Sequence, residues 1–221
     1  MTAFFEDYSS FLGNGQTNEK GQTLDEFLEE YNPYKYKNPC STVDVVVFSY
    51  NENPIKDTEW KVLLIQRKNH PSIGYWALPG GFVELHENLE QSAHRELEEE
   101  TGVQGLHLEQ IRAYGDEKRD PRGRIITTGY MSIVKDSDVK VKASDDAADA
   151  HWFTIHVSKN EDVYTLKMDY EDIHTMCTIQ KTIQGTIVQE EKNTILKNEF
   201  LSSDHGVIIL DAWLRLQQRL Q

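Results

Sequence analysis

One helical segment with β-prone runs on both sides of it in the chain is the feature that most constrains the fold. Residues 89–101 place Leu89, Ala93 and Leu97 along one stripe, the spacing of a helix that packs an apolar face on a sheet. Runs rich in β-branched and aromatic residues predict strands at residues 42–50, 60–67, 106–114, 125–135 and 150–155. Strands on both sides of a single helix predict an α/β (α+β) fold with a mixed sheet.

The C-terminal part of the chain has a different pattern. Three short β-prone segments separated by turns predict a meander, at residues 163–168, 173–182 and 186–195. Residues 204–220 then form an apolar stripe at helical spacing and predict a closing helix. We therefore interpret residues 158–200 as a β-prone insertion that precedes this helix.

The N-terminal part is polar and lacks sustained periodicity as far as Lys20. Thr23 then opens a capping box, and the apolar spacing that follows predicts a short helix that ends before Pro33. We expect residues 1–36 to be an N-terminal arm with this helix, and residues 37–221 to form the main domain.

The acidic charge of the chain restricts its partners. Lys and Arg number 23 and Asp and Glu 37, and the net charge of -14 opposes attraction to nucleic acid or an anionic membrane. No apolar run reaches the ~18 residues of a membrane span, and residues 1–12 lack the basic start of a signal peptide. Cys40 and Cys177 cannot build a disulfide framework. We expect a cytoplasmic protein with no membrane or nucleic-acid partner.

The helix at residues 89–101 carries an acidic stripe. Glu96, Glu99 and Glu100 lie within roughly 100° of one another around its axis. Like charges at these spacings destabilise a helix by a few tenths of a kcal/mol per pair, and within the helix only Arg95 offsets them. Arg95 can also donate a forked hydrogen bond to Glu87 in the preceding turn. Mg²⁺ binds one or two carboxylates together with waters and substrate phosphates. An acidic face in solvent is the alternative.

Glycines flank the acidic helix and favour the cation site. Gly80 and Gly81 precede the helix, where a chain without Cβ atoms lets the backbone approach a ligand closely. Gly102 suits the left-handed residue that ends a helix. The segment therefore combines a tight turn, an acidic helix and a defined helix end.

Residues 81–103 resemble the Nudix box, Gly-x5-Glu-x7-Arg-Glu-U-x-Glu-Glu-x-Gly-U, where U is aliphatic. Each position of the box is filled, by Gly81, Glu87, Arg95, Glu96, Leu97, Glu99, Glu100, Gly102 and Val103. The wider resemblance covers about residues 34–155 and resumes weakly in the last helix. It implies the Nudix fold, an α/β/α sandwich with a mixed sheet, and Mg²⁺- or Mn²⁺-dependent hydrolysis of a nucleoside diphosphate linked to another moiety.

The resemblance also implies roles for individual residues. The implied metal ligands are the carbonyl of Gly80 and the carboxylates of Glu96, Glu99 and Glu100. Arg95 and Glu87 would orient these carboxylates. The general base is Glu96 or an acid on a later loop, for which Asp146 is the candidate. Asp146 can instead simply begin the strand that contains Trp152.

The substrate prediction comes from two segments, residues 34–45 and 114–124, which resemble the ADP-ribose pyrophosphatase branch. ADP-ribose or a related nucleotide sugar is therefore the expected substrate. Candidate substrate contacts are Arg67, Phe82, Arg122 and Arg124. For the last two the alternative is a solvated hairpin tip, and for Phe82 it is the core.

A related branch of the family uses this fold as an ADP-ribose sensor joined to a C-terminal winged-helix domain that binds DNA. From Ser158 onward this chain has 7 basic and 10 acidic residues, which favours the enzyme over the DNA-binding regulator. The branch also implies a homodimer. Asp204 and His205 resemble an Asp-His pair of the branch, but Ser203 replaces the usual aromatic residue before it. His205 is therefore interpreted as a cap or packing residue.

Overall fold

The computed structural model describes residues 4, 6–55, 58–142 and 147–220. The chain divides into two compact units, Met1–Asn38 and Pro39–Gln221. The first unit contains a 3-10 turn, η1 (Ser9–Phe11), and one helix, α1 (Leu24–Glu30). The predicted capping box of α1 is confirmed, because the Thr23 hydroxyl accepts from the Glu26 N–H and the Glu26 carboxylate accepts from the Thr23 N–H.

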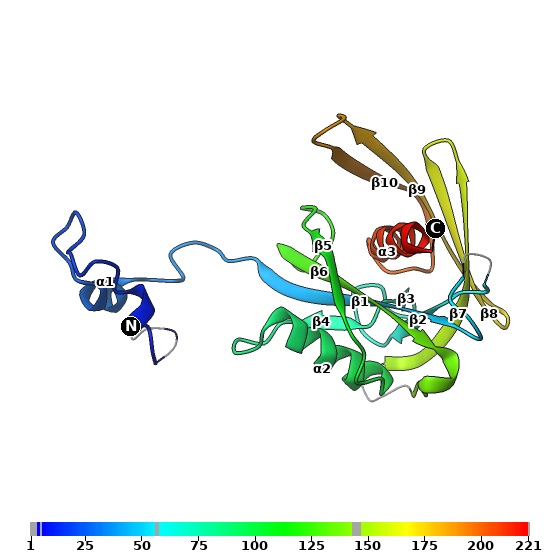
Figure 1. Cartoon of the computed structure of the whole chain (residues 1–221), viewed down its shortest axis with the longest axis horizontal. Helices are drawn as coiled ribbons and strands as arrows, with labels where there is room; N and C mark the ends of the chain where they lie inside the picture. Colours follow the sequence, from blue (N-terminus) through cyan, green and yellow to red (C-terminus); the bar gives the residue numbers. More distant parts are fainter. Residues whose placement is uncertain (1–3, 5, 56–57, 143–146, 221) are drawn as a thin grey trace. The chain divides into compact units, whose positions relative to one another are not determined.

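The second unit is built on one mixed sheet, as the sequence predicts (Figure 1). Its strands are β1 (Cys40–Tyr50), β2 (Lys61–Arg67), β3 (Trp76–Ala77), β4 (Gly80–Phe82), β5 (Glu109–Tyr114), β6 (Ile125–Lys135), β7 (Ala147–Asn160), β8 (Val163–Tyr170), β9 (Ile173–Gln184) and β10 (Glu190–Glu199). The sheet order is β10-β9-β8-β7-β2-β1-β6-β5, with β3 paired to β2 and β4 paired to β1. β1 and β6 are parallel, and the other pairs are antiparallel.

Two helices cover opposite faces of the sheet, α2 (Leu89–Thr101) and α3 (His205–Arg219) (Figure 1). Side chains of a strand alternate between faces, so neighbouring residues of β1 enter different cores. Val45 belongs to the cluster that contains Leu97 of α2, whereas Val46 belongs to the cluster that contains Ile208 of α3. By the same alternation Asp44 faces the α3 side of the sheet.

The β-prone segment before the last helix extends this sheet. β8 pairs with β7 from Val163 to Asp169, and β9 and β10 follow in antiparallel register. The strand predicted at 186–195 begins only at Glu190. Ile187 and Val188 are β-branched, but they lie in the connection after Gly185 and are 97% and 86% exposed, respectively. Their intrinsic preference for β-structure is not sufficient to form a strand, because no neighbouring strand in the described part of the chain is available for backbone hydrogen bonds. The two short strands β3 and β4 were not predicted.

Charged groups fix α3 against the sheet. The carboxylate of Asp211 accepts from Arg112, from the Tyr114 hydroxyl and from Lys181. These partners come from β5 and β9, on two sides of the helix. The position of the first turn of α3 is therefore set by contacts along the helix, which matters because that turn borders the cavity described below. Among the described residues, no helix is long and apolar enough to cross a membrane.

Candidate active site

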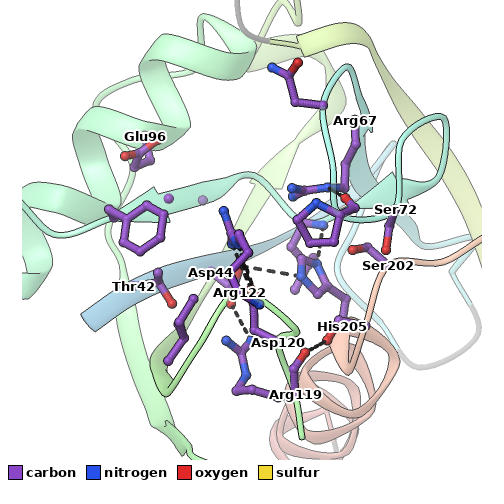
Figure 2. A pocket seen from close by; sticks show the side chains of 18 of the residues that line it. Thr42, Asp44, Arg67, Ser72, Glu96, Arg119, Asp120, Arg122, Ser202 and His205 are labelled. Carbon is purple, nitrogen blue, oxygen red and sulfur yellow. Dashed lines mark hydrogen bonds and ion pairs between the residues drawn. The ribbon is translucent and has the colours of Figure 1, made fainter. Parts of the chain in front are cut away.

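A cavity of about 680 Å³ opens where β4, α2, the loop between β5 and β6 and the start of α3 meet (Figure 2). Glu96 and Glu100 of α2 line one wall, and Asp44, Arg119 and His205 line another. The size falls within the range of small-molecule binding sites. The cavity thus brings together groups from four distant parts of the sequence.

Arg95 connects the acidic residues of the Nudix box through hydrogen bonds. Its Nε and Nη2 donate to the two carboxylate oxygens of Glu87 at 2.7 and 3.0 Å, which is the fork expected from the sequence. Its Nη1 donates to Glu96 at 2.8 Å and to Glu99 at 3.0 Å. The hydrogen bonds from Arg95 lower the pKa of Glu87 to about 2. Arg95 therefore orients the acidic side chains of the helix and of the preceding turn.

Glu96 and Glu100, the two box glutamates that line the cavity, differ in their surroundings. Glu100 accepts a hydrogen bond from the backbone N–H of Gly80 at 2.8 Å. Burial, and then the neighbouring charges of Glu96 and Asp44, raise the pKa of Glu100 to about 8. Burial also raises the pKa of Glu96. These carboxylates would be stabilised by a positive charge between them.

The donor set fits a hard divalent cation. In the part of the chain that the structure describes, no three acidic, histidine or cysteine side chains already form a metal-ligating group, and the Glu99 carboxylate accepts from Arg95. However, a Cβ atom on Gly81 would lie 2.5 Å from the carboxylate of Glu96, so the glycine leaves room for that carboxylate beside the strand. The carboxylates of Glu96 and Glu100 are largely buried, repel each other and lie beside the glycine backbone of β4. Such oxygen donors match the ligands that Mg²⁺ or Mn²⁺ prefers.

The opposite wall contains a buried ionic network that the sequence interpretation missed. Asp44, inside the valine-rich strand β1, accepts from the Thr127 hydroxyl at 2.7 Å. Arg119 lies 3.5 Å from the same carboxylate and donates twice to Asp204, at 2.9 and 3.0 Å. Burying a carboxylate inside an apolar strand costs free energy unless the carboxylate has a charged or hydrogen-bonding partner. An aspartate in the valine-rich run of β1 was therefore the sequence signal that could have identified Asp44.

His205 is a third residue of this wall that the sequence did not assign to the site. Its ring is buried, and its Nδ1 accepts from the backbone N–H of Leu78 at 2.8 Å. Burial lowers the pKa of His205 below its usual range, which keeps the ring neutral. The histidine packs at the start of α3, as the sequence suggests, but it also lines the cavity.

The predicted substrate contacts are distributed unevenly. Arg67, Phe82 and Arg122 line the cavity, whereas Arg124 is not among the lining residues and donates to the carbonyl of Asp116. Phe82 is 44% exposed, so the core alternative is wrong for it. The guanidinium of Arg122 lies over its ring, 5.1 Å from the centroid. Asp146, the alternative base, lies outside the described residues.

This fold and this box define the chain as a member of the Nudix family, because the NUDIX domain model matches residues 40–169. Two characterised relatives match part of the chain. The ADPR responsive transcriptional repressor NtrR of Acinetobacter baylyi is 44% identical over 110 residues, which is 49% of this chain and 42% of that protein. An ADP-ribose pyrophosphatase of Methanocaldococcus jannaschii is 37% identical over 121 residues, 55% of this chain and 65% of that protein. The chain therefore matches less than two thirds of the length of either relative.

Solved structures extend the similarity over most of the chain. A MutT/nudix family protein from Enterococcus faecalis has a TM-score of 0.68 and 33% identity, covering 97% of this chain and 76% of that one. The NUDIX domain of Shewanella oneidensis NrtR, complexed with ADP ribose, has a TM-score of 0.62 and 29% identity. That match covers 88% of this chain and 99% of the NrtR domain.

Proposed function

We propose that the chain is a divalent-metal-dependent hydrolase that cleaves the pyrophosphate bond of a nucleoside diphosphate joined to a second moiety, with ADP-ribose or a related nucleotide sugar as substrate. The carrying observation is that two box glutamates, Glu96 and Glu100, face a cavity that is also lined by Arg67 and Arg122. Acidic groups for a cation and guanidinium groups for phosphate oxygens are what a diphosphate ester with its metal requires.

The residues divide the work as follows. Glu96 and Glu100, together with Glu99 and the carbonyl of Gly80, would hold the metal, and Arg95 would keep the carboxylates in place. Mg²⁺ or Mn²⁺ bound there supplies charge neutralisation on the diphosphate and lowers the pKa of water. Glu96 is the proposed base that takes the proton from the attacking water. Arg67 and Arg122 would bind phosphate oxygens on the far side of the cavity.

Arg67 is the better placed of these two arginines. Its Nε donates to the carbonyl of Pro71 at 2.8 Å, which fixes the side chain at the cavity. Burial, and then the charge of Arg122, lower its pKa. A cation that is buried and repelled by a second cation favours an anionic ligand. Arg122 is partly neutralised by Asp120 at 2.8 Å.

The substrate class rests on the two relatives whose names refer to ADP-ribose and on the NrtR domain that was solved with it. The test is turnover of ADP-ribose, NADH, dinucleoside polyphosphates, nucleotide sugars and oxidised dNTPs with Mg²⁺ or Mn²⁺. Glu100→Gln should abolish turnover while the thermal unfolding profile stays that of a folded protein. Glu98→Gln is the matched control, because Glu98 is exposed on the same helix. A Glu100→Gln variant that retains metal-dependent activity would contradict the metal assignment.

An ADP-ribose-responsive regulator is the second candidate, favoured by the 44% identity to the repressor of A. baylyi. The absence of a nucleic-acid partner therefore stays a prediction. In the described part of the chain, β7 is followed by the strands β8, β9 and β10 and then by the helix α3. A gel shift with DNA from upstream of the chain's own gene, with and without ADP-ribose, separates the two. Tight ADP-ribose binding without turnover, together with a shift that ADP-ribose reverses, would favour the regulator.

A homodimer, which the resemblance to this branch implies, and a cytoplasmic location, which two free cysteines favour, remain proposals. Sedimentation equilibrium of the full chain tests the first. Cell fractionation tests the second.

A further inference from the structure

Two side chains on the cavity wall opposite α2 have no role in the proposed metal site. His205 and Asp44 both line the cavity, and Figure 2 shows them on that wall. Only 8% of the His205 side chain and 10% of the Asp44 side chain is exposed. Polar groups this buried are normally fully hydrogen-bonded, so any unused donor or acceptor on them needs an explanation.

The proton on His205 is placed by the backbone. Its Nδ1 accepts from the Leu78 N–H at 2.8 Å, so that nitrogen carries no proton. A neutral imidazole has one N–H, which must therefore be on Nε2. His205 consequently presents a fixed hydrogen-bond donor on the side of the ring that faces Asp44.

Asp44 presents the matching acceptor. Its Oδ2 is used by the Thr127 hydroxyl at 2.7 Å and lies 3.5 Å from Arg119. Its Oδ1 lies 3.8 Å from Nε2 of His205, which is too long for a hydrogen bond. Among the described residues, the hydrogen bonds of this pair use Nδ1 of His205 and Oδ2 of Asp44 and leave Nε2 and Oδ1 without a partner. Neither Nε2 nor Oδ1 is among the fully buried atoms that lack a partner, so this donor and this acceptor are both open to the cavity they line.

We propose that Nε2–H of His205 and Oδ1 of Asp44 together bind one hydroxyl group of the ligand, a ribose or other sugar hydroxyl. A hydroxyl accepts from one group and donates to the other at the same time. A phosphate oxygen cannot donate, and the charge of Asp44 repels it. This inference rests on the proposed function, in which the ligand is a nucleoside diphosphate joined to a second moiety. It makes the pair a determinant of ligand specificity.

Two substitutions separate this role from the structural one. His205→Asn places an amide near the position of Nδ1, so it keeps a partner for the Leu78 N–H but removes the donor at Nε2. His205→Gln is longer and can place an amide N–H near the position of Nε2. A purely structural histidine would depend on the Leu78 contact and would not distinguish between ligands.

Calorimetric binding in EDTA measures affinity without turnover. The three ligands are ADP-ribose, β-methyl-ADP, which lacks the second sugar, and an ADP-ribose with 2′,3′-dideoxyadenosine, which lacks the hydroxyls of the first. His205→Asn should bind ADP-ribose about tenfold more weakly than the wild type, as expected for one lost hydrogen bond. One analogue, the one without the recognised hydroxyl, should bind the wild type and this variant equally. His205→Gln should retain most of the wild-type affinity for ADP-ribose.

Equal weakening of all three ligands in His205→Asn, as a displaced water or a distorted cavity would cause, would overturn the inference. No change for any ligand would overturn it as well. If the wild type hydrolyses ADP-ribose with Mg²⁺ and His205→Asn shows either of these results, the proposed function stands and only this inference fails. If the wild type neither binds nor hydrolyses any of the three ligands, both fail.

Discussion

Arg119 and Asp204 join two segments of the cavity wall that are 85 residues apart in the sequence. The guanidinium donates from Nε and Nη2 to both carboxylate oxygens, at 3.0 and 2.9 Å. Only 6% of the arginine side chain and 17% of the aspartate side chain is exposed. Arg119 belongs to the loop that carries Arg122, and Asp204 immediately precedes His205. The pair therefore holds the loop against the start of α3.

Replacing Asp204 with alanine should destabilise the fold and weaken substrate binding. Removal of Asp204 from this buried ion pair leaves Arg119 with only the more distant carboxylate of Asp44, at 3.5 Å, so the free energy of unfolding should fall by about 3 kcal/mol. Because the loop loses its anchor, KM for the substrate should rise more than kcat falls. Urea unfolding and steady-state kinetics measure the two effects.

The control for this substitution is Lys197→Gln. Lys197 pairs with Glu199 at the surface, and their side chains are 58% and 44% exposed, respectively. Its loss should change the free energy of unfolding by less than about 1 kcal/mol. Equal effects of Asp204→Ala and Lys197→Gln would contradict the anchoring role of Asp204.

Replacing Gly81 with alanine should damage the site without unfolding the protein. The added Cβ would lie 2.5 Å from the end of the Glu96 side chain, which can move at little cost to stability. A carboxylate displaced by about 1 Å can reduce turnover by about a hundredfold. Gly123→Ala is the matched control, since a Cβ there meets no atom within 4 Å. Unchanged metal-dependent turnover in Gly81→Ala would show that the position of Glu96 is not critical.

Glu109 should make stability depend on pH in the acid range. Arg219 and Arg215 donate to its carboxylate and lower its pKa to about 2, against about 4.3 in an unfolded chain. The unfolded chain therefore takes up the proton first as the pH falls. The stabilisation is fully present above about pH 4.5 and is lost as the pH falls towards 2. It should stay below about 1 kcal/mol, since the carboxylate is 43% exposed.

Urea unfolding of the wild type and of Glu109→Gln between pH 2 and 8 measures this effect. The difference between the two unfolding free energies should be constant from pH 6 to 8 and should shrink below about pH 4.5. Glu98→Gln, an exposed site on α2, corrects for the change in net charge. A difference that stays constant down to pH 2 would contradict the depressed pKa of Glu109.

The features that could be predicted from sequence are those that depend on residues close to one another along the chain. The bounds of α2 and its left-handed end at Gly102 agree with the prediction, as does the fork between Arg95 and Glu87, eight residues apart. Helical periodicity, capping and near-neighbour charge pairs act over such distances, so local patterns contain them. The mixed sheet follows similarly from where the β-prone runs lie. Strand ends are weaker predictions, as residues 186–189 illustrate, because a strand needs a partner.

The cavity wall opposite α2 could not be predicted in this way, because its residues are far apart in the sequence. Asp44, Arg119 and His205 come from a strand, a loop and a helix start, and none of the three was assigned to the site from the sequence. They meet because β1 and β6 pair in parallel and because α3 returns across the sheet after β10. The sequence accordingly contains the acidic half of the site in one continuous motif. The wall that contains Asp44, Arg119 and His205 exists only after folding, because long-range strand pairing and helix packing bring these side chains to one side of the cavity.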